Sequence, residues 1–449
     1  MIEKIVYVVH CVDTEGPLHE SLTATSQRLN EIFGVELDLT PELLVAIQEK
    51  KVNLNGLEDE VAKVLSPQLL QYLDSWDKID EMLKYIMSSK FRNQFKDSYG
   101  NGWIYNWHCL DHVGFETNPR RRDMGHHSIF DHYVDMKRYT KSYSDSIQFH
   151  HHPVGFGRHA HKPATNYLSN NPLIYEILAR KIIDRKWFPS VYRPGFHTTR
   201  PDSHWFLEQY IPFEYANQAK ISDECSEELQ HDLSGGRFGD WRRATKTWTP
   251  YHPDHDDYQV KGNCRRTIAK CLNIGTRVRL LGRDDVNDAF ASAQKGKSVV
   301  LGVTNHDFRN IVDDINGVRS LVSEVSKNYP GVKFKYSEAR EAMRLAMNLE
   351  FRSPLEFEIK LLGNQLLVKS NHDIFGPQPF LALKTNDGRY YHDNFDFQVP
   401  FREWTYTFDD MTIPLCALES FGIAGNDRYG NVAVNNFCIK NSTETTRLL

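Results

Sequence analysis

Two acidic side chains directly follow the first apolar run of the chain, and this stretch limits the possible folds more than any other. Residues 5–12 are almost continuously apolar and rich in β-branched side chains, which is typical of a strand buried on both faces of a parallel sheet. Asp13 and Glu15 come next, and Gly16-Pro17 ends the strand. Because side chains two residues apart on a strand share a face, both carboxylates can enter one pocket at the carboxyl end of the sheet. Parallel α/β proteins place their chemistry at that edge.

Strand-like and helix-like segments alternate through the first three-quarters of the chain. Further strand-like runs lie at residues 103–107, 146–149, 189–193, 213–215, 298–303 and 332–336. Between them, apolar side chains recur at steps of three and four residues, as in helices with one buried face. The alternation predicts an α/β domain over residues 1–348, with a parallel sheet and outer helices. Two stretches with few periodic apolar positions, near 18–74 and 224–283, are predicted to be insertions.

The apolar pattern changes after residue 350. Short runs such as 357–361 and 366–370 alternate apolar with polar side chains, and turn sequences such as Asn386-Asp387-Gly388 separate them. Frequent turns between alternating strands are typical of antiparallel sandwiches. We therefore predict a C-terminal β-sandwich domain over residues 349–449.

The composition excludes several classes of partner. The net charge of −5 gives no basic excess, so nothing favours nucleic acid or an anionic membrane surface, and small or neutral substrates fit better. No apolar run approaches the ~18 residues that a membrane-spanning helix needs. The seven cysteines are scattered without a CxxC pair and no export signal is visible, so we expect reduced thiols and a cytoplasmic protein.

A run of three histidines follows the strand predicted at 146–149. His150 and His152 share a face of an extended chain, where two imidazoles can bind one metal ion. A carboxylate from Glu15 or Asp13, at the end of a neighbouring strand, would complete a set of three protein ligands. Three ligands with a fourth position for water is the arrangement of catalytic zinc. We therefore predict a divalent metal site with zinc favoured, although cobalt, nickel or iron suits the same ligand types.

A basic run, Arg120-Arg121-Arg122, stands beside Asp123 in a segment that also carries histidines. Two interpretations fit this run: a solvated surface loop, or a loop that faces the substrate. Both interpretations stay open on the sequence.

Four motifs, in order, resemble those of the polysaccharide deacetylases of the NodB-homology superfamily, also called carbohydrate esterase family four. They are Asp13-Thr14-Glu15-Gly16-Pro17, His150-His151-His152, Tyr192-Arg193-Pro194-Gly195-Phe196 and Val300-Leu301-Gly302-Val303-Thr304-Asn305-His306. The resemblance covers roughly residues 5–345 without the insertions, and it does not include the C-terminal domain. It implies a distorted (β/α) barrel of the deacetylase type.

The resemblance also implies a role for each matching residue. The metal ligands would be Glu15, His150 and His152. Asp13 would be the general base that takes a proton from water, Arg193 would keep it ionised and oriented, and His306 would be the general acid. The metal would supply the activated water and stabilise the oxyanion that forms.

The second motif differs from the family pattern. The family spaces its two metal-binding histidines four residues apart, whereas position 154 here is a valine. The choice of His150 with His152 therefore comes from strand geometry. The residues that could replace one of the pair are His151, His159 and Asp111.

The remaining motif of the family has two candidates in the insertion near 224–283. They are Asp240-Trp241 and Trp248-Thr249-Pro250, either of which would supply an aromatic wall and a partner for the acid. We expect the side chains of Trp241, Trp248 and Tyr251 to contact the substrate.

Three functions remain open on these residues. The first is a metal-dependent hydrolase that removes an acetyl group from an N-acetylated sugar or glycan precursor. The second is a hydrolase of another non-peptide carbon–nitrogen bond on the same barrel. The third is a carbohydrate-binding protein without catalysis, in which aromatic loops and the sandwich hold a glycan.

Overall fold

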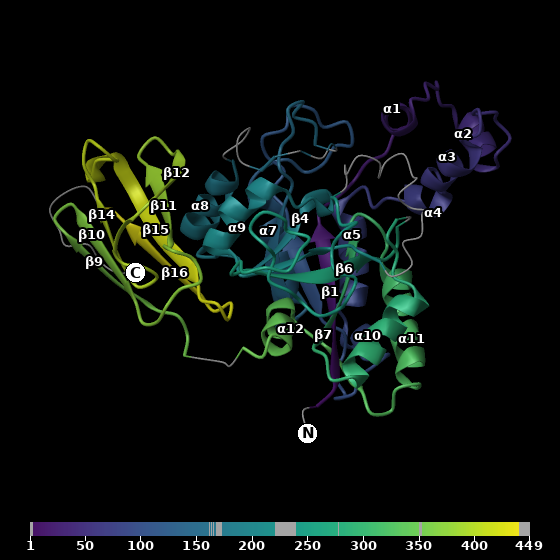
Figure 1. The fold of residues 1–449 in the computed structure, drawn as a ribbon. Helices are drawn as coiled ribbons and strands as arrows, with labels where there is room; N and C mark the ends of the chain where they lie inside the picture. Colours follow the sequence, from purple (N-terminus) through teal and green to yellow (C-terminus); the bar gives the residue numbers. More distant parts are fainter. Residues whose placement is uncertain are drawn as a thin grey trace.

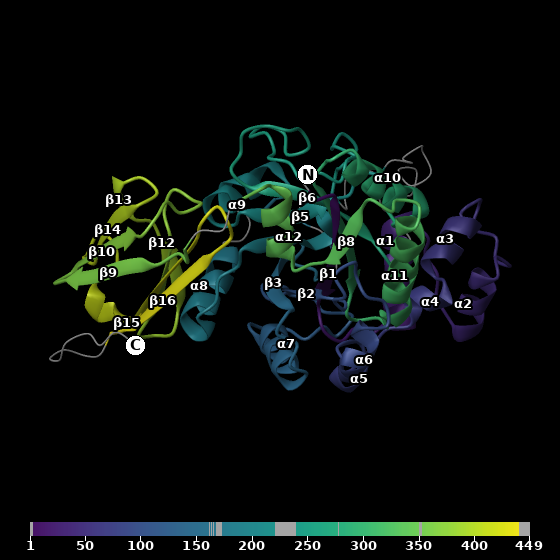
Figure 2. The ribbon, with the colours of Figure 1, turned by 90° about the horizontal axis from the view of Figure 1, so that it is seen from below.

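The molecule has a central barrel, with a β-sandwich on one side and a group of short helices on the other (Figure 1). Figure 2 gives the same arrangement seen from below. The computed structural model describes residues 3–160, 162, 164, 166–167, 173–220, 239–276, 278–349 and 353–439. Within this part of the chain, no helix is long and apolar enough to cross a membrane.

Seven parallel strands close into the barrel. Their order around the ring is β1 (Ile5–Thr14), β2 (Tyr105–Cys109), β3 (Ser146–His151), β4 (Val191–Pro194), β5 (Phe213–Asn217), β6 (Thr267–Asn273) and β7 (Val299–His306), and β7 pairs with β1. An eighth strand, β8 (Lys333–Tyr336), pairs with residues 5–8 of β1, while β2 pairs with residues 10–14. All strands of the ring run parallel, so their carboxyl ends meet at one rim.

Helices surround the barrel. They are α5 (Trp76–Ile86), α6 (Ser89–Arg92), α7 (Ser128–Tyr139), α8 (Leu173–Arg185), α9 (His204–Tyr210), α10 (Arg283–Gln294), α11 (Val312–Ser326) and α12 (Ala339–Ala346). Apolar side chains of β1, β7 and β8 form one buried cluster with those of α5, α10 and α11. This packing holds fixed the strands that carry the rim residues.

The two predicted insertions have different outcomes. Residues 18–74 fold into α1 (Leu22–Phe33), α2 (Pro41–Gln48), α3 (Glu58–Val64) and α4 (Pro67–Leu70), and these helices share an apolar cluster of their own. The prediction of an insertion over 224–283 is wrong in its second half, because that half contains the barrel strand β6. Residues 221–238 lie outside the described part of the chain.

The C-terminal domain is the predicted sandwich. One sheet has the order β13 (Asp396–Val399), β14 (Glu403–Thr407), β10 (Gln365–Ser370) and β9 (Phe357–Leu362). The other has the order β12 (Tyr390–Asp393), β11 (Phe380–Thr385), β15 (Leu418–Asn426) and β16 (Val432–Cys438). The second sheet packs on α8, where Phe380 and Ala424 share a buried cluster with Ile182. The prediction of a (β/α) barrel followed by a β-sandwich is confirmed.

Candidate metal centre

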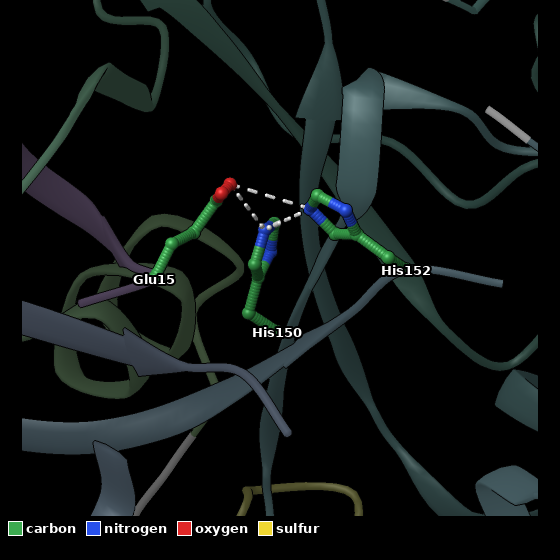
Figure 3. A group of neighbouring side chains, drawn as sticks. All are labelled: Glu15, His150 and His152. Carbon is green, nitrogen blue, oxygen red and sulfur yellow. Dashed lines mark hydrogen bonds and ion pairs between the residues drawn. The ribbon is translucent and has the colours of Figure 1, made fainter. Parts of the chain in front are cut away.

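Three buried side chains from two strand ends converge at the carboxyl rim of the barrel (Figure 3). Glu15 follows β1, His150 lies on β3, and His152 follows β3. The Nε2 atoms of the two histidines are 3.0 Å apart. Glu15 Oε1 lies 3.4 Å from Nε2 of His152 and 3.9 Å from Nε2 of His150.

This donor set fits a divalent metal ion. The Nδ1 atom of His150 lies 2.9 Å from the carbonyl oxygen of Arg193 and donates to it, which leaves the lone pair of Nε2 directed at the other two ligands. Two imidazole nitrogens on one tetrahedral zinc ion would be roughly 3.3 Å apart, close to the separation seen here. Two imidazoles and one carboxylate also form one of the ligand sets of catalytic zinc.

Asp13 and Arg193 form a buried ion pair beside this centre. Arg193 Nε donates to Asp13 Oδ1 at 2.6 Å, and both side chains are at most 2% exposed. Arg193 also donates to the carbonyl of Tyr215 and to Nδ1 of His197. Burial alone would raise the pKa of Asp13, but the positive charge of Arg193 holds it well below its usual range. Asp13 is therefore ionised at neutral pH.

His306 ends β7 and faces both acids. Its Nε2 atom lies 3.8 Å from Asp13 Oδ2 and 3.7 Å from Glu15 Oε1. Its ring stacks on Phe308, with 4.7 Å between the ring centroids. Desolvation lowers the pKa of His306 to about 4 against the pull of the two carboxylates, so the imidazole is neutral at pH 7.

A small pocket of about 190 Å³ opens above these groups. Its lining includes Asp13, Glu15, His152 and His306. Several of its other side chains are basic or aromatic: Arg120, Arg122, Arg279, Arg309, Phe196, His197 and Phe308. The volume is below the ~300–1,000 Å³ of drug-sized pockets, so this pocket suits a small group of a substrate.

Two residues that support Glu15 were not predicted from the sequence. Arg122 Nη1 forms an ion pair with Glu15 Oε2. Asp307 accepts hydrogen bonds from the backbone N–H groups of Glu15 at 2.8 Å and Gly16 at 3.0 Å, and so ties the end of β1 to β7. The adjacency of Asp307 to His306 was its only sequence signal, and the basic run was the signal for Arg122.

The backbone after β4 is strained where it approaches the centre. Phe196 and His197 have φ angles of 53° and 55°, a region that residues other than glycine rarely adopt. The Phe196 ring packs on His152 with 4.7 Å between the ring centroids. The turn therefore fixes the position of His152, one of the candidate metal ligands, through the Phe196 ring. His197, in the same turn, accepts a hydrogen bond from the guanidinium of Arg193.

Substituting Gly195 by alanine is expected to weaken metal binding at least tenfold. A Cβ at this position would lie 2.1 Å from Cδ2 of His152, so the imidazole would have to move. Displaced ligands bind metal less tightly, as outer-shell substitutions show. The measurement is zinc affinity by competition with a chelating dye.

The matched control for that variant is Gly157→Ala. A Cβ there would lie 2.8 Å from Cδ2 of His159, a clash with a histidine outside the three-ligand group. Equal zinc affinity in Gly195→Ala and Gly157→Ala would show that the position of His152 does not matter for the metal.

The three predicted substrate contacts belong to the core. Trp241, Trp248 and Tyr251 are at most 3% exposed and are absent from the lining of the pocket. The indole of Trp241 donates to the carbonyl of His197, and that of Trp248 donates to the carbonyl of Asp285. Trp241 and Trp248 therefore hold loop backbone through their indoles in this structure, and a contact between these three side chains and a substrate stays a prediction.

The alternative ligands are also placed elsewhere. His151 stacks on Phe149, and Asp111 forms an ion pair with Lys181 at 2.9 Å. His159 lies against the hydroxyl of Thr117. None of the three joins the group of Glu15, His150 and His152 in the described part of the chain.

A second group with metal-binding residue types, His204, Glu208 and Cys264, lies between α9 and the loop before β6. The guanidinium of Arg266 already donates to Nδ1 of His204, and to Glu208 Oε1 at 3.3 Å. A cation there would meet a fixed positive charge and compete for the same lone pairs. The first group is thus the better metal centre.

Comparison with known proteins assigns no family to the chain. No family model matches it, and no curated protein matches it.

Proposed function

We propose that this chain is a metal-dependent hydrolase of the polysaccharide-deacetylase type, which removes an acetyl group from an N-acetylated sugar or glycan precursor. One observation carries the proposal. The three-ligand group, the buried Asp13–Arg193 pair and His306 come from four strand ends far apart in sequence, yet they meet at one rim. Such a collection of perturbed titratable groups around a pocket is typical of a catalytic site.

Each group has a chemical task in amide hydrolysis. A divalent cation held by Glu15, His150 and His152, for which the ligand types favour zinc, would polarise the acyl carbonyl and lower the pKa of water. Asp13, ionised beside Arg193, accepts the proton of the water that attacks the acyl carbon. Breaking the carbon–nitrogen bond then requires a proton on the leaving nitrogen.

His306 is placed to deliver that proton. Because its imidazole is neutral at pH 7, it does not start as the imidazolium that the family resemblance suggests. It must first receive the proton that Asp13 took from water, across the 3.8 Å between Asp13 Oδ2 and Nε2. The proton then passes to the leaving amine, and the products are acetate and the free amine.

The pocket lining also favours a second candidate on the same residues, a hydrolase of another non-peptide carbon–nitrogen bond. The tryptophans expected to stack on sugar rings are buried in the core. Among the described residues that line the pocket of about 190 Å³, the phenyl rings come from Phe196 and Phe308. A short or monomeric amide fits this volume better than a long glycan chain.

Metal-dependent acetate release tests the proposal. The zinc-loaded full chain is expected to release acetate from N-acetylglucosamine or its small derivatives, and chelation of the metal should abolish the activity. Release of ammonia or another amine from non-sugar amides, without acetate from any acetylated sugar, would favour the second candidate. Absence of both, with sugar binding intact, would leave a binding protein.

A further inference from the structure

One wall of the pocket carries more positive than negative charge. This basic wall consists of Arg120, Arg122 and Arg309, with Arg28 behind it. Its carboxylate partners are Glu15, paired with Arg122, and Glu20, shared by Arg28 at 3.4 Å and Arg120 at 3.0 Å. Four guanidinium groups therefore face two carboxylates, although the whole chain has a net charge of −5.

Arg309 is the member of the basic wall for which no ion pair with a carboxylate is found among the described residues. It donates to the carbonyl of Leu69 at 3.2 Å and to the hydroxyl of Tyr72 at 3.4 Å, and both acceptors are neutral. Its guanidinium also lies 5.1 Å from the ring centroid of Phe308. The guanidinium is thus held in place by neutral acceptors, and Asp314 interacts with its charge only without an ion pair.

The pKa of the Tyr72 phenol is consistent with the same excess of positive charge. Burial would raise its pKa, but the guanidinium groups of Arg28, Arg309 and Arg120 lower it below its usual value. The like charges also affect Arg120. Burial lowers its pKa, and so do the positive charges of Arg28 and Arg122. The positive potential on this side of the pocket is therefore only partly neutralised by Glu20.

Arg122 adds a donor without an acceptor. Its side chain lines the pocket and is 7% exposed, yet its buried Nε has no hydrogen-bond partner among the described residues. Buried donors of this kind normally have an acceptor, and a guanidinium suits an oxyanion best. The same side chain holds Glu15 through Nη1, so this donor is adjacent to the metal centre.

We propose that the basic wall binds an oxyanion of the substrate, a phosphate or a carboxylate, while the acetamido group of the same molecule reaches the metal centre. The inference rests on the proposed function and narrows its substrate class to anionic acetylated sugars. Phe308 links the two parts of the pocket, because its ring stacks on His306 and lies near the guanidinium groups of Arg122 and Arg309. One small substrate can therefore contact both.

Binding of non-hydrolysable products to the full chain tests the wall apart from catalysis. The probes are glucosamine, glucosamine 1-phosphate, glucosamine 6-phosphate, muramic acid as the carboxylate, and inorganic phosphate, measured by titration calorimetry. At least one anionic sugar is expected to bind tenfold or more tighter than glucosamine, since charge-assisted hydrogen bonds are the strong ones. The preference should fall as salt is added.

Arg309→Met is expected to lower the ratio of anionic to neutral affinity at least fivefold, and Arg309→Lys should retain part of it because the charge remains. The matched control is Arg138→Met, whose side chain is 73% exposed on α7 and paired with Asp135. This control should bind all probes as the unmodified chain does.

Two results would overturn the inference: equal affinity for glucosamine and every anionic probe, or an anion preference that Arg309→Met leaves unchanged. Acetate release from neutral N-acetylglucosamine in that case would leave the proposed function intact. Conversely, an anion preference that depends on Arg309, without acetate release from any acetylated sugar, would support the wall and contradict the hydrolase.

Discussion

We expect the full chain to bind one zinc ion, and replacing His152 by asparagine to reduce the bound zinc to less than a tenth of an ion per chain. The substitution removes one of three protein ligands from a centre in which Nε2 of His152 lies 3.0 Å from Nε2 of His150 and 3.4 Å from Glu15 Oε1. Outer-shell changes alone typically weaken metal binding by ~10–100-fold, so loss of a ligand should cost more. Inductively coupled plasma mass spectrometry on dialysed protein gives the ratio directly.

The adjacent histidine supplies the matched control. His151 is as buried as His152 but stacks on Phe149, outside the group. His151→Asn should therefore keep one zinc ion per chain, even if it unfolds at a lower temperature. Zinc retained in His152→Asn and lost in His151→Asn would place the metal on the other face of the strand end.

The rim residues of β1, β3, β4 and β7 could be predicted from the sequence because each follows a buried apolar run directly. In a parallel barrel the carboxyl ends of such runs meet, which predicted that Asp13, Glu15 and His150 lie close together. Arg193 and His306 were expected at the same rim through the resemblance of the ordered motifs to the deacetylase family. The period of two also separated His150 and His152 from His151. Local pattern and global topology point to the same rim here.

Strand β6 was not predicted because its sequence is not a continuous apolar run. Thr267–Asn273 is buried along its whole length although it contains Lys270. The ammonium of Lys270 lies 4.2 Å from the ring centroid of Trp248 and donates to the carbonyl of Lys246 at 3.1 Å. These two contacts, with Trp248 and Lys246, compensate for burying the ammonium group of Lys270. They come from a separate loop, so the sequence of the strand itself does not predict them.

The aromatic and basic side chains of the pocket also depend on long-range packing. The sequence alone does not show whether Trp241 stacks on a sugar ring or packs in the core. The structure shows that its indole donates a hydrogen bond to the carbonyl of His197. The basic run divides in the structure, since Arg120 and Arg122 line the pocket while Arg121 is exposed. The net charge of the chain led to the prediction of small or neutral substrates. A net charge sums over the whole molecule, so it does not reveal a local excess of positive charge at one pocket.

Removing either partner of the Asp13–Arg193 pair is expected to have the largest effect on the protein. Arg193→Met leaves the carboxylate of Asp13 buried without its guanidinium, and it removes the donors to the Tyr215 carbonyl and to His197. Breaking a buried ion pair in this way costs about 3–5 kcal/mol of the free energy of unfolding. Denaturant titration of the metal-loaded chain measures the loss, and acetate release should fall with it.

Asp13→Asn separates catalysis from metal binding. The asparagine keeps the shape of the side chain and cannot accept a proton from water, so kcat should fall by about 10²–10⁴-fold. Zinc content should stay at one per chain, because Asp13 does not belong to the three-ligand group. A loss of zinc equal to the loss of activity would instead make Asp13 a ligand, and full activity would remove it from the reaction.

The double variant Asp13→Asn/Arg193→Met shows whether the two residues act as a pair. Each single variant leaves one buried charge without its partner, whereas the double variant leaves neither. Its free energy of unfolding should therefore exceed, by about 0.5–3 kcal/mol, the value expected from adding the two single losses. Strict additivity would mean that the 2.6 Å contact contributes nothing to folding, and that Arg193 acts through Tyr215 and His197 instead.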